Sequence, residues 1–318
     1  MIPLVFRNHN HYHLRPQSVS NEIGVIGQGR MGTDRREATP RSRVTRSSRS
    51  TSMRRPSNQR LRRGATVTPS LEEFIATLEP PRYLWLMVPA GEPVDITLDE
   101  LENDLDPADI VVDGGNSHYA DSVRRAEDCP AQYLDCGTSG GPAGADLGFS
   151  LMVGGPGEAY EELEPAFNAV ATGPSGHAHL GPAGAGHYVK MVHNGVEYAL
   201  MQAYGEGFEL LHEGRYDLDL EAVAGVWNNG AVIRSWLLEL CEEAFREEGS
   251  DLETVADHVA GGSTGTWTVQ EALEQEIPLP IIYTALAERF GSRVPNRFSR
   301  QLANRLRYGF GRHEIIRE

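Results

Sequence analysis

A chain of 318 residues is long enough to form two domains that each bury a hydrophobic core. Its 45 acidic residues outnumber 29 basic ones and give a formal net charge of −16, which disfavours nucleic acid and anionic membranes as partners. No apolar run reaches the length of a membrane span, and the three cysteines lack disulfide or metal-ligand spacing, so we expect no bound metal. Abundant carboxylates with a single lysine are typical of a halophilic, cytoplasmic protein.

The chain begins with a short apolar run, residues 1–6, which His9, His11 and His13 follow. The run is too short to be the apolar region of a signal peptide. We therefore expect residues 1–21 to form a disordered leader.

A glycine-rich turn follows the first predicted strand, residues 23–26. The turn has the pattern G-x-G-x-x-G and consists of Gly27, Gln28, Gly29, Arg30, Met31 and Gly32. Such a turn is a weak signal alone, but directly after a strand it is typical of a dinucleotide-binding fold, in which backbone amides approach a pyrophosphate. We therefore expect these six residues to bind a dinucleotide cofactor.

Residues 33–63 interrupt this pattern where a helix and a second strand are expected. They contain eleven arginines together with Pro40 and Pro56, and they show neither a helical nor a strand period. Their composition is that of a disordered basic tract. Because the tract is about as long as the missing helix and strand, we hypothesise that it is translated out of frame. The other reading frames of the gene are then expected to encode both elements.

Alternating strands and helices resume after residue 64. Helices are predicted at residues 71–76, with Ser70 as N-cap, and at 95–101 and 122–128; strands are predicted at 83–88, 110–113, 132–136 and 150–155. This alternation predicts a doubly wound parallel sheet, and ligands bind at the carboxyl ends of such strands. The turns after Val88, Asp113 and Cys136 are therefore expected to face the cofactor and the substrate.

The character of the sequence changes near residue 180. Residues 181–186 are rich in glycine, and helical patterns then dominate at about 187–213, 221–247 and 266–288. We expect a dinucleotide-binding domain over residues 22–180 and an all-helical domain for substrate binding and dimerisation over residues 181–318.

The only lysine of the chain, Lys190, lies in the first of these long helices. Arginine keeps its proton near neutral pH, whereas lysine can release one once burial or a nearby charge lowers its pKa. His193, Asn194 and Glu197 follow at offsets that return to the same helix face. One face is therefore predicted to carry an amine, an imidazole, an amide and a carboxylate.

These groups fit an oxidoreductase that makes two proton transfers. The strand-end turns and the polar helix face would enclose a cleft between the two domains, with a nicotinamide bound there. Neutral Lys190 would take the proton of an alcohol, and Glu197 would be the second acid, as an oxidation followed by decarboxylation requires. The alternative is an exposed ion pair on a helix surface, worth roughly 0.2–1 kcal/mol.

The chain resembles the decarboxylating 6-phosphogluconate dehydrogenases in their shorter form. The motifs that carry the resemblance extend from about residue 22 to the end, apart from residues 33–63. They are residues 27–32, 113–117, 139–145, 184–198, 264–268 and 307–313. The related 3-hydroxyacid dehydrogenases typically show Lys-x-x-Asn-Asn, whereas this chain has Lys-x-x-His-Asn at Lys190.

The resemblance implies a reaction and a set of roles. Lys190 would be the base for the 3-hydroxyl and then an acid toward the ketone, and Glu197 would protonate C1 of the enediol. The products would be ribulose 5-phosphate and CO2, as in gluconate utilization and the pentose phosphate pathway, with a hydride passed to NADP or NAD. The hydroxyls and carboxylate of the sugar acid would contact Asn116, Ser139, Gly140, Gly141, His193 and Asn194.

The same resemblance implies further binding residues. The phosphate would contact Tyr198, Arg289, Arg307 and His313, and the nicotinamide would lie beside Val88, Pro89, Ala90 and Asn116. In this family the C-terminal arginine and histidine reach across from a neighbouring subunit. The resemblance therefore implies a homodimer or homotetramer with shared active sites.

Two departures keep alternatives open. Gly262 and Thr266 stand where longer family members carry lysines, so another 3-hydroxyacid dehydrogenase, without a phosphate site, is one alternative. The tract at 33–63 replaces the segment that normally grips the adenosine half of the cofactor. A non-catalytic remnant with a disrupted cofactor half is the other alternative.

Overall fold

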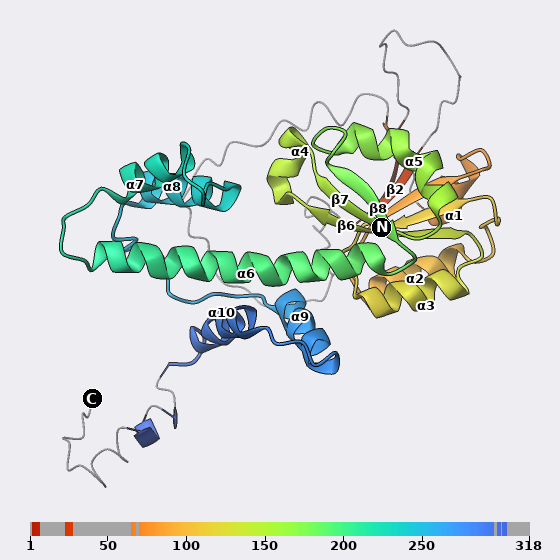
Figure 1. Cartoon of the computed structure of the whole chain (residues 1–318). Helices are drawn as coiled ribbons and strands as arrows, with labels where there is room; N and C mark the ends of the chain where they lie inside the picture. Colours follow the sequence, from red (N-terminus) through yellow and green to blue (C-terminus); the bar gives the residue numbers. More distant parts are fainter. Residues whose placement is uncertain are drawn as a thin grey trace, which may run out of the picture. The chain divides into compact units, whose positions relative to one another are not determined.

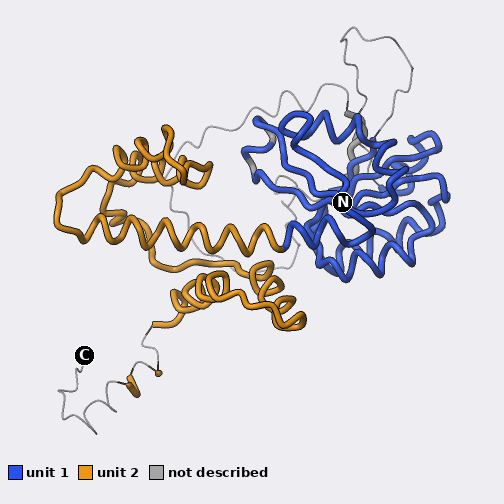
Figure 2. Tube along the Cα trace, viewed as in Figure 1, with its two compact units in different colours: residues 1–191 blue, residues 192–318 orange. Residues whose placement is uncertain are grey.

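The computed structural model describes residues 2–6, 23–27, 65–67, 70–295, 298–299 and 301–303, so the tract at 33–63 lies outside the described residues. The chain divides into two compact units, residues 1–191 and 192–318 (Figure 2). Unit 1 contains a β-sheet flanked by helices, and the described part of unit 2 is helical (Figure 1). The expected α/β domain followed by a helical domain is confirmed.

The strands described in unit 1 form one sheet in the order β3-β1-β2-β4-β5-β6-β7-β8. Their bounds are β1 Ile2–Phe6, β2 Ile23–Gly27, β3 Ala65–Val67, β4 Tyr83–Met87, β5 Ile110–Asp113, β6 Gln132–Ser139, β7 Ser150–Gly154 and β8 His177–Gly181. Strands β2, β4, β5 and β6 are parallel neighbours, as predicted. Their carboxyl ends therefore share one edge of the sheet.

Strand β7 is an exception within the predicted doubly wound parallel sheet, because it runs antiparallel to β6. The connection between them, residues 140–149, contains only the 3-10 turn Gly141–Ala143 and the short helix α4, Gly144–Leu147. A parallel neighbour needs a crossover of a dozen or more residues, whereas an antiparallel one does not. The last strand, β8, is again parallel to β7.

Strand β1 contradicts the disordered leader expected for residues 1–21 at residues 2–6, and residues 7–21 of that prediction lie outside the described residues. It pairs antiparallel with both β2 and β3, in the registers Leu4 to Val25 and Leu4 to Val67. The physical reason is that an apolar run with branched residues has strand propensity, and pairing on both sides satisfies its backbone groups.

Both faces of the sheet are buried, which accounts for the nearly continuous apolar strands. In β4, Leu84 and Leu86 face one core with helices α1 (Leu71–Ala76), α2 (Glu92–Leu101) and α3 (Tyr119–Asp128). Tyr83 and Trp85 alternate to the opposite core, which α5 (Gly157–Val170) covers. Figure 1 shows α2 and α3 on one side of the sheet and α5 on the other. Ser70 caps α1 by accepting the Glu73 N–H at 3.1 Å, as predicted.

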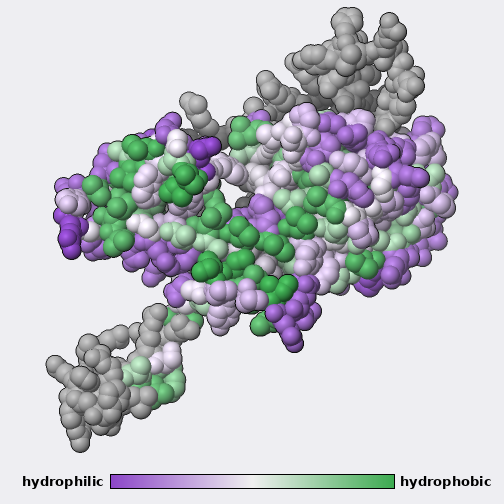
Figure 3. Space-filling view, in the orientation of Figure 1, coloured by the Kyte–Doolittle hydropathy of each residue, from purple (hydrophilic) through white to green (hydrophobic). Residues whose placement is uncertain are grey.

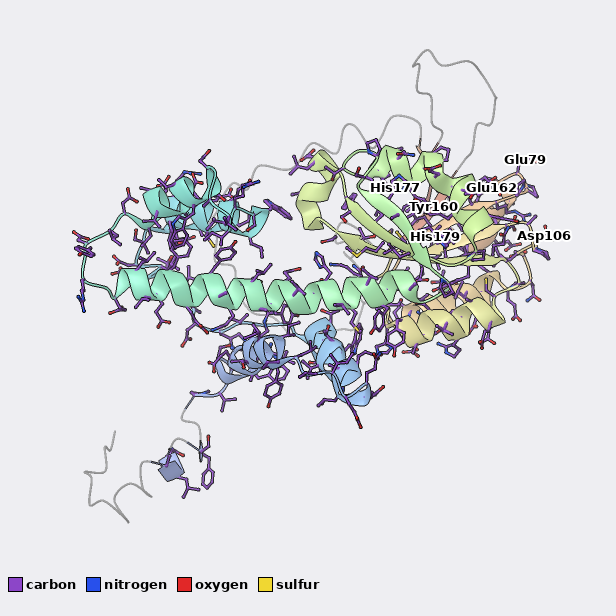
Figure 4. The ribbon with its side chains drawn as sticks, viewed as in Figure 1. Glu79, Asp106, Tyr160, Glu162, His177 and His179 are labelled. Atoms are coloured by element: carbon purple, nitrogen blue, oxygen red, sulfur yellow. The ribbon has the colours of Figure 1, made fainter. Side chains whose placement is uncertain are left out.

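Helix α5 is held to the last strand by a polar contact within an aromatic group. The Tyr160 hydroxyl lies 2.8 Å from Nδ1 of His177, and the Tyr160 ring stacks on Phe167 with centroids 5.4 Å apart. His179 lies beside the same tyrosine ring and makes a 2.8 Å hydrogen bond with the Gly155 carbonyl (Figure 4). These contacts attach α5 to β8, the last strand of the sheet.

The longest helix, α6 (Ala185–His212), begins in unit 1 and continues into unit 2. Unit 2 adds α7 (Leu220–Asn228), α8 (Trp236–Glu248), α9 (Ser263–Glu274) and α10 (Pro280–Gly291). Phe208 of α6 packs on Phe245 of α8 with ring centroids 4.9 Å apart, inside a core that includes Leu220, Ala224 and Leu238. Among the described residues, no helix combines the length and apolar character needed to cross a bilayer.

Two predicted long helices are each broken into a pair. The pattern at 221–247 is interrupted at Asn229 and Gly230, where Gly230 has a φ of +98°, and Ser235 then caps α8. The pattern at 266–288 is interrupted before Pro280, which begins α10. Glycine favours the left-handed conformation that ends a helix, and proline cannot donate a hydrogen bond inside one. The apolar period alone therefore overestimated the lengths of the two predicted helices.

Candidate functional site

The first turn of α6 is held by a buried carboxylate. Asp135 lies in β6 and is fully buried. Its Oδ1 accepts the backbone N–H of Gly184 at 2.7 Å, and its Oδ2 accepts that of His187 at 2.7 Å. The first N–H groups of a helix lack intrahelical partners and form its positive end, so a carboxylate is favourable there. Asp135 thereby fixes the backbone of α6 one turn before Lys190.

Glycines let α6 approach the sheet at that point. A Cβ atom at Gly137 would lie 2.4 Å from Cβ of Lys190, and one at Gly186 would lie 2.3 Å from the Met152 carbonyl oxygen. Neither position has room for a larger residue. Lys190 itself is only 7% exposed, so the predicted base is buried against the end of β6 within unit 1.

His187 adds a buried imidazole one turn before Lys190. Its Nδ1 lies 2.7 Å from the Ser122 hydroxyl of α3 and 4.0 Å from Oδ2 of Asp135. Its side chain is fully buried. His187 therefore links α6, α3 and β6, and sequence reasoning missed both His187 and Asp135. The sequence offers little indication of either role, because the partners of both side chains lie in other elements.

The turn after β5 is ordered by Asp113, a buried carboxylate at the end of that strand. It accepts hydrogen bonds from the Gly115 N–H at 2.9 Å, the Ser117 hydroxyl at 2.7 Å and the Tyr133 hydroxyl at 2.9 Å. Because these donors come from the turn itself and from β6, the conformation of residues 113–117 is fixed.

Asn116 occupies the tip of this turn with a φ of +55°, a left-handed conformation that asparagine tolerates better than most residues. Its Oδ1 accepts the Thr138 N–H at 2.8 Å, and its Nδ2 donates to the Thr138 carbonyl at 3.2 Å. The predicted ligand residue is thus brought beside Ser139, Gly140 and Gly141. Among the described contacts, its amide uses one of two N–H donors and one of two lone pairs, so one of each remains for a bound molecule.

The turn after β4 carries Val88, Pro89 and Ala90. Val88 is buried, whereas Pro89 and Ala90 are exposed at the carboxyl edge of the sheet. A Cβ atom at Gly115 would lie 2.6 Å from the Val88 carbonyl oxygen, so the turns after β4 and β5 touch. A Cβ atom at Gly27 would likewise lie 3.0 Å from the Met87 carbonyl.

The described strand ends fit a dinucleotide. Strands β4 and β5 are parallel neighbours, and the turns that follow them contain Gly91, Gly114 and Gly115 at the edge where such sheets bind nucleotides. Of the residues predicted to bind, seven lie outside the described residues: Gln28, Gly29, Arg30, Met31, Gly32, Arg307 and His313.

In unit 2, α6 presents the predicted imidazole, amide and carboxylate together. Nδ1 of His193 lies 3.0 Å from Oδ1 of Asn194 and 3.8 Å from Oε2 of Glu197. The Glu197 side chain is 38% exposed. The helical offsets read from the sequence therefore do bring these three side chains together.

Tyr198 and Arg289, predicted to bind the same group, are also in contact. The guanidinium carbon of Arg289 lies 3.8 Å above the centroid of the Tyr198 ring, a cation–π geometry. A Cβ atom at Gly265 would lie 2.3 Å from Cε2 of that ring, so the tyrosine lies against the first turn of α9. Nη1 of Arg289 also donates to the Ala260 carbonyl at 3.4 Å.

Arg293 follows α10 and brings a second guanidinium beside the start of α9. Sequence reasoning missed this residue. Its Nε donates to the Val259 carbonyl at 2.8 Å, and its Nη2 donates to the Gly261 carbonyl. Gly262, the N-cap of α9, supplies no side-chain acceptor. Among the described residues, no carboxylate pairs with Arg289 or Arg293 within 4.0 Å. In the sequence, the signal for Arg293 was its position one helical turn after Arg289.

The electrostatic character of this region is therefore cationic, in a chain whose net charge is −16. Two guanidinium groups and the positive end of α9 converge on the segment 259–265. Arginine forks and helix N-termini both favour phosphate or carboxylate ligands.

Comparison with known proteins places both halves of the chain. Residues 22–181 match the family model for the NAD binding domain of 6-phosphogluconate dehydrogenase, and residues 186–309 match the model for its C-terminal domain. The chain is 74% identical over 255 residues to the NAD(+)-dependent, decarboxylating 6-phosphogluconate dehydrogenase of Haloferax volcanii, with 80% of this chain and 85% of the relative covered. A putative 6-phosphogluconate dehydrogenase of Bacillus subtilis is 44% identical over 253 residues, covering 79% and 84%.

A solved structure of Plasmodium falciparum 6-phosphogluconate dehydrogenase, described with NADP+ and with 6-phosphogluconate, is similar to the chain with a TM-score of 0.66 and 31% identity. The match covers 78% of this chain and 55% of that one, so this chain spans about half the length of the longer enzyme.

The anchoring of α6 gives a stability prediction. Replacing Asp135 by Asn sets an amide N–H₂ against a backbone N–H donor and removes a charge-assisted hydrogen bond. We expect Asp135→Asn to lower the free energy of unfolding by about 2–3 kcal/mol in urea titrations. The control is Asp128→Asn, at an exposed carboxylate of α3, which should change it by less than about 0.5 kcal/mol. Equal effects of the two substitutions would contradict the anchor.

Proposed function

The chain belongs to the 6-phosphogluconate dehydrogenase family, and from that premise we propose that it oxidises and decarboxylates 6-phosphogluconate to ribulose 5-phosphate and CO2. The observation that carries the proposal is the single lysine of the chain, buried on α6 beside Gly137 at the carboxyl edge of a dinucleotide-binding sheet. NAD is the proposed cofactor rather than NADP, on the strength of the Haloferax volcanii relative and its printed NAD(+) dependence.

The cofactor and the residues around it have distinct tasks. The nicotinamide, when bound, supplies the acceptor for the hydride. The turns after β2, β4 and β5 would hold it, with Val88, Pro89 and Ala90 on the nicotinamide side. Asn116 would contact both cofactor and substrate, which its position at the tip of the turn after β5 supports.

Lys190 is the proposed general base. In its neutral form it accepts the proton of the 3-hydroxyl as C3 is oxidised to a ketone. It returns that proton to the ketone oxygen as CO2 leaves. Lysine suits a base at this position because its ammonium can lose a proton in a buried site, whereas a guanidinium cannot. The hydrogen bonds of Asp135 to the first turn of α6 hold the lysine backbone in place.

Glu197 is the proposed acid that protonates C1 of the enediol. It is partly exposed and lies beside His193, so a proton lost to the product can be replaced from solvent. His193 and Asn194, in unit 2, would contact the hydroxyls and carboxylate of the sugar acid. Ser139, Gly140 and Gly141 would do so from unit 1, where both glycines have a positive φ that a larger residue rarely adopts.

Tyr198 and Arg289 are the proposed phosphate ligands, and the geometry adds Arg293 to them. Both guanidinium groups contact the segment before the N-terminus of α9, and that combination supports a phosphate ligand there. Arg307 and His313 complete the proposed set. Gly262 stands where longer members carry a lysine, and Arg293 brings a guanidinium to within 3.4 Å of the Cβ position there.

We also propose that the change from the nucleotide-binding half to the substrate-binding half falls near residue 181, between the two family matches.

Unit 2 exposes many large apolar side chains, and they gather over α6 (Figure 3). The exposed apolar side chains of unit 2 include Val196, Leu200 and Met201 of α6, Leu273 of α9, and Ile281 and Tyr283 of α10. Exposed apolar area on this scale is typical of a subunit interface.

The base assignment is tested by Lys190→Arg. Because arginine retains its proton, we expect kcat to fall by about 10²–10⁴-fold, the usual contribution of a general base. The fold should persist, as judged by circular dichroism. Arg215→Lys, a matched exchange at an exposed site, should leave kcat unchanged. NADH formation at the wild-type rate in Lys190→Arg would refute the assignment.

The phosphate site is tested by Arg289→Gln. Losing a charged hydrogen bond worth roughly 1.5–3 kcal/mol should raise KM for 6-phosphogluconate by about 10–150-fold. Any oxidation of unphosphorylated gluconate should be unaffected. Arg234→Gln, at an exposed arginine elsewhere in unit 2, serves as control. An unchanged KM would favour a 3-hydroxyacid dehydrogenase without a phosphate site.

The assembly is tested by light scattering on the purified protein. We expect the mass of two or four chains at micromolar concentration and high salt, because the exposed apolar side chains of unit 2 need a partner surface. A monomer that turns over at full rate would contradict shared active sites.

A further inference from the structure

A buried arginine in α3 contacts the turns after two strands of the sheet. Arg125 is 2% exposed and is among the largest fully buried side chains described. On one side its Nε and Nη2 donate to the two carboxylate oxygens of Asp95 at 2.8 and 3.1 Å. Nη2 also donates to the Gly91 carbonyl at 3.0 Å. Asp95 and Gly91 both belong to the segment that follows β4.

On its other side Arg125 reaches the turn after β5. Nη1 donates to the Ser117 hydroxyl at 3.0 Å and lies 3.4 Å from Oδ2 of Asp113. The guanidinium therefore lies between the end of β4 and the end of β5, with a carboxylate on each side. The rigid fork of arginine makes all of these contacts at once, which the single ammonium of a lysine cannot do.

The contact extends to the end of β6 through Asn116. The turn that Arg125 holds at Asp113 and Ser117 has Asn116 at its tip, and the Asn116 amide is bonded twice to Thr138 in β6. Gly115 meanwhile packs against the Val88 carbonyl. The turns after β4 and β5 and the end of β6 are thus connected through the hydrogen bonds of Arg125 and Asn116.

Stability alone does not account for this arrangement. An apolar side chain of similar volume would fill the same space without the desolvation cost of a buried charge. The guanidinium, however, also joins the segment 88–95 to the segment 113–117, because it donates hydrogen bonds to both. Hydrogen bonding to Arg125, and then to Arg124, lowers the pKa of Asp95 to about 2, so this carboxylate stays ionised across the working range of pH.

We propose that Arg125 is a positioning residue for hydride transfer: it fixes the turn proposed to lie beside the nicotinamide relative to Asn116, which is proposed to contact the substrate. The inference rests on the proposed function. It assigns Arg125 no contact with either molecule, because its side chain is enclosed by protein.

The neighbouring arginine provides a matched control. Arg124 also donates to Oδ1 of Asp95, at 2.8 Å, but its side chain is 52% exposed and it does not reach Asp113 or Ser117 among the described contacts. Exchanging Arg124 therefore removes an arginine contact to the same aspartate while leaving the spacing of the two turns intact.

The experiment compares Arg125→Lys with Arg124→Gln, using NAD+ and 6-phosphogluconate that carries either hydrogen or deuterium at C3. In Arg125→Lys we expect kcat to fall by about 100-fold, the scale of a misplacement near 1 Å. The deuterium isotope effect on kcat/KM should rise, because a slower hydride step then limits the rate. Arg124→Gln should keep the wild-type kcat and isotope effect. The folded fraction of each variant is measured by near-UV circular dichroism.

A purely structural role gives a different result. Misfolding would lower kcat only in proportion to the folded fraction and leave KM and the isotope effect unchanged, and that outcome overturns the proposal. If Arg125→Lys does not fold, Ser117→Ala decides, since it removes one contact of the network and keeps both carboxylates. A raised isotope effect there supports the proposal, and a wild-type value overturns it. Wild-type protein that forms no NADH would instead refute the proposed function.

Discussion

The placement of the candidate base depends on one buried carboxylate, that of Asp135. Its backbone belongs to the parallel sheet, and its two oxygens bind the first free N–H groups of α6. A buried carboxylate without donors would be too costly to retain, so the charge and the helix end stabilise each other. Through this contact, strand β6 and the first turn of α6, which precedes Lys190, are held together within unit 1.

Close backbone approach is the second constraint, and glycine alone satisfies it. Gly137 in β6 and Gly186 in α6 face each other where any Cβ would overlap with neighbouring atoms. The missing side chains allow α6 to lie directly on the strand ends, which is how Lys190 becomes buried. The same logic brings Tyr198 against Gly265 at the start of α9, beside the arginines proposed to hold a phosphate.

Local pattern predicted much of the fold because local physics dominates there. Apolar runs gave β2, β4, β5 and β6, and Ser70 marked the start of α1. Pattern failed where contacts between elements decide. The antiparallel direction of β7 follows from a short connection and strand pairing. The continuing apolar period also concealed two local breaks, because Gly230 follows the end of α7 and Pro280 begins α10. The strand at Ile2–Phe6 likewise exists through pairing with β2 and β3.

The amino-acid sequence by itself determined that one lysine is available as a proton carrier, that His193, Asn194 and Glu197 share its helix, and that glycine-rich turns end the strands. These properties depend on residue type and on spacing along one element. Only the tertiary structure decided that Asp135, Arg125 and Arg293 matter. Their partners lie far away in the chain, as Gly184 lies 49 residues from Asp135, and a buried polar group takes its role from the donors and acceptors that folding brings to it.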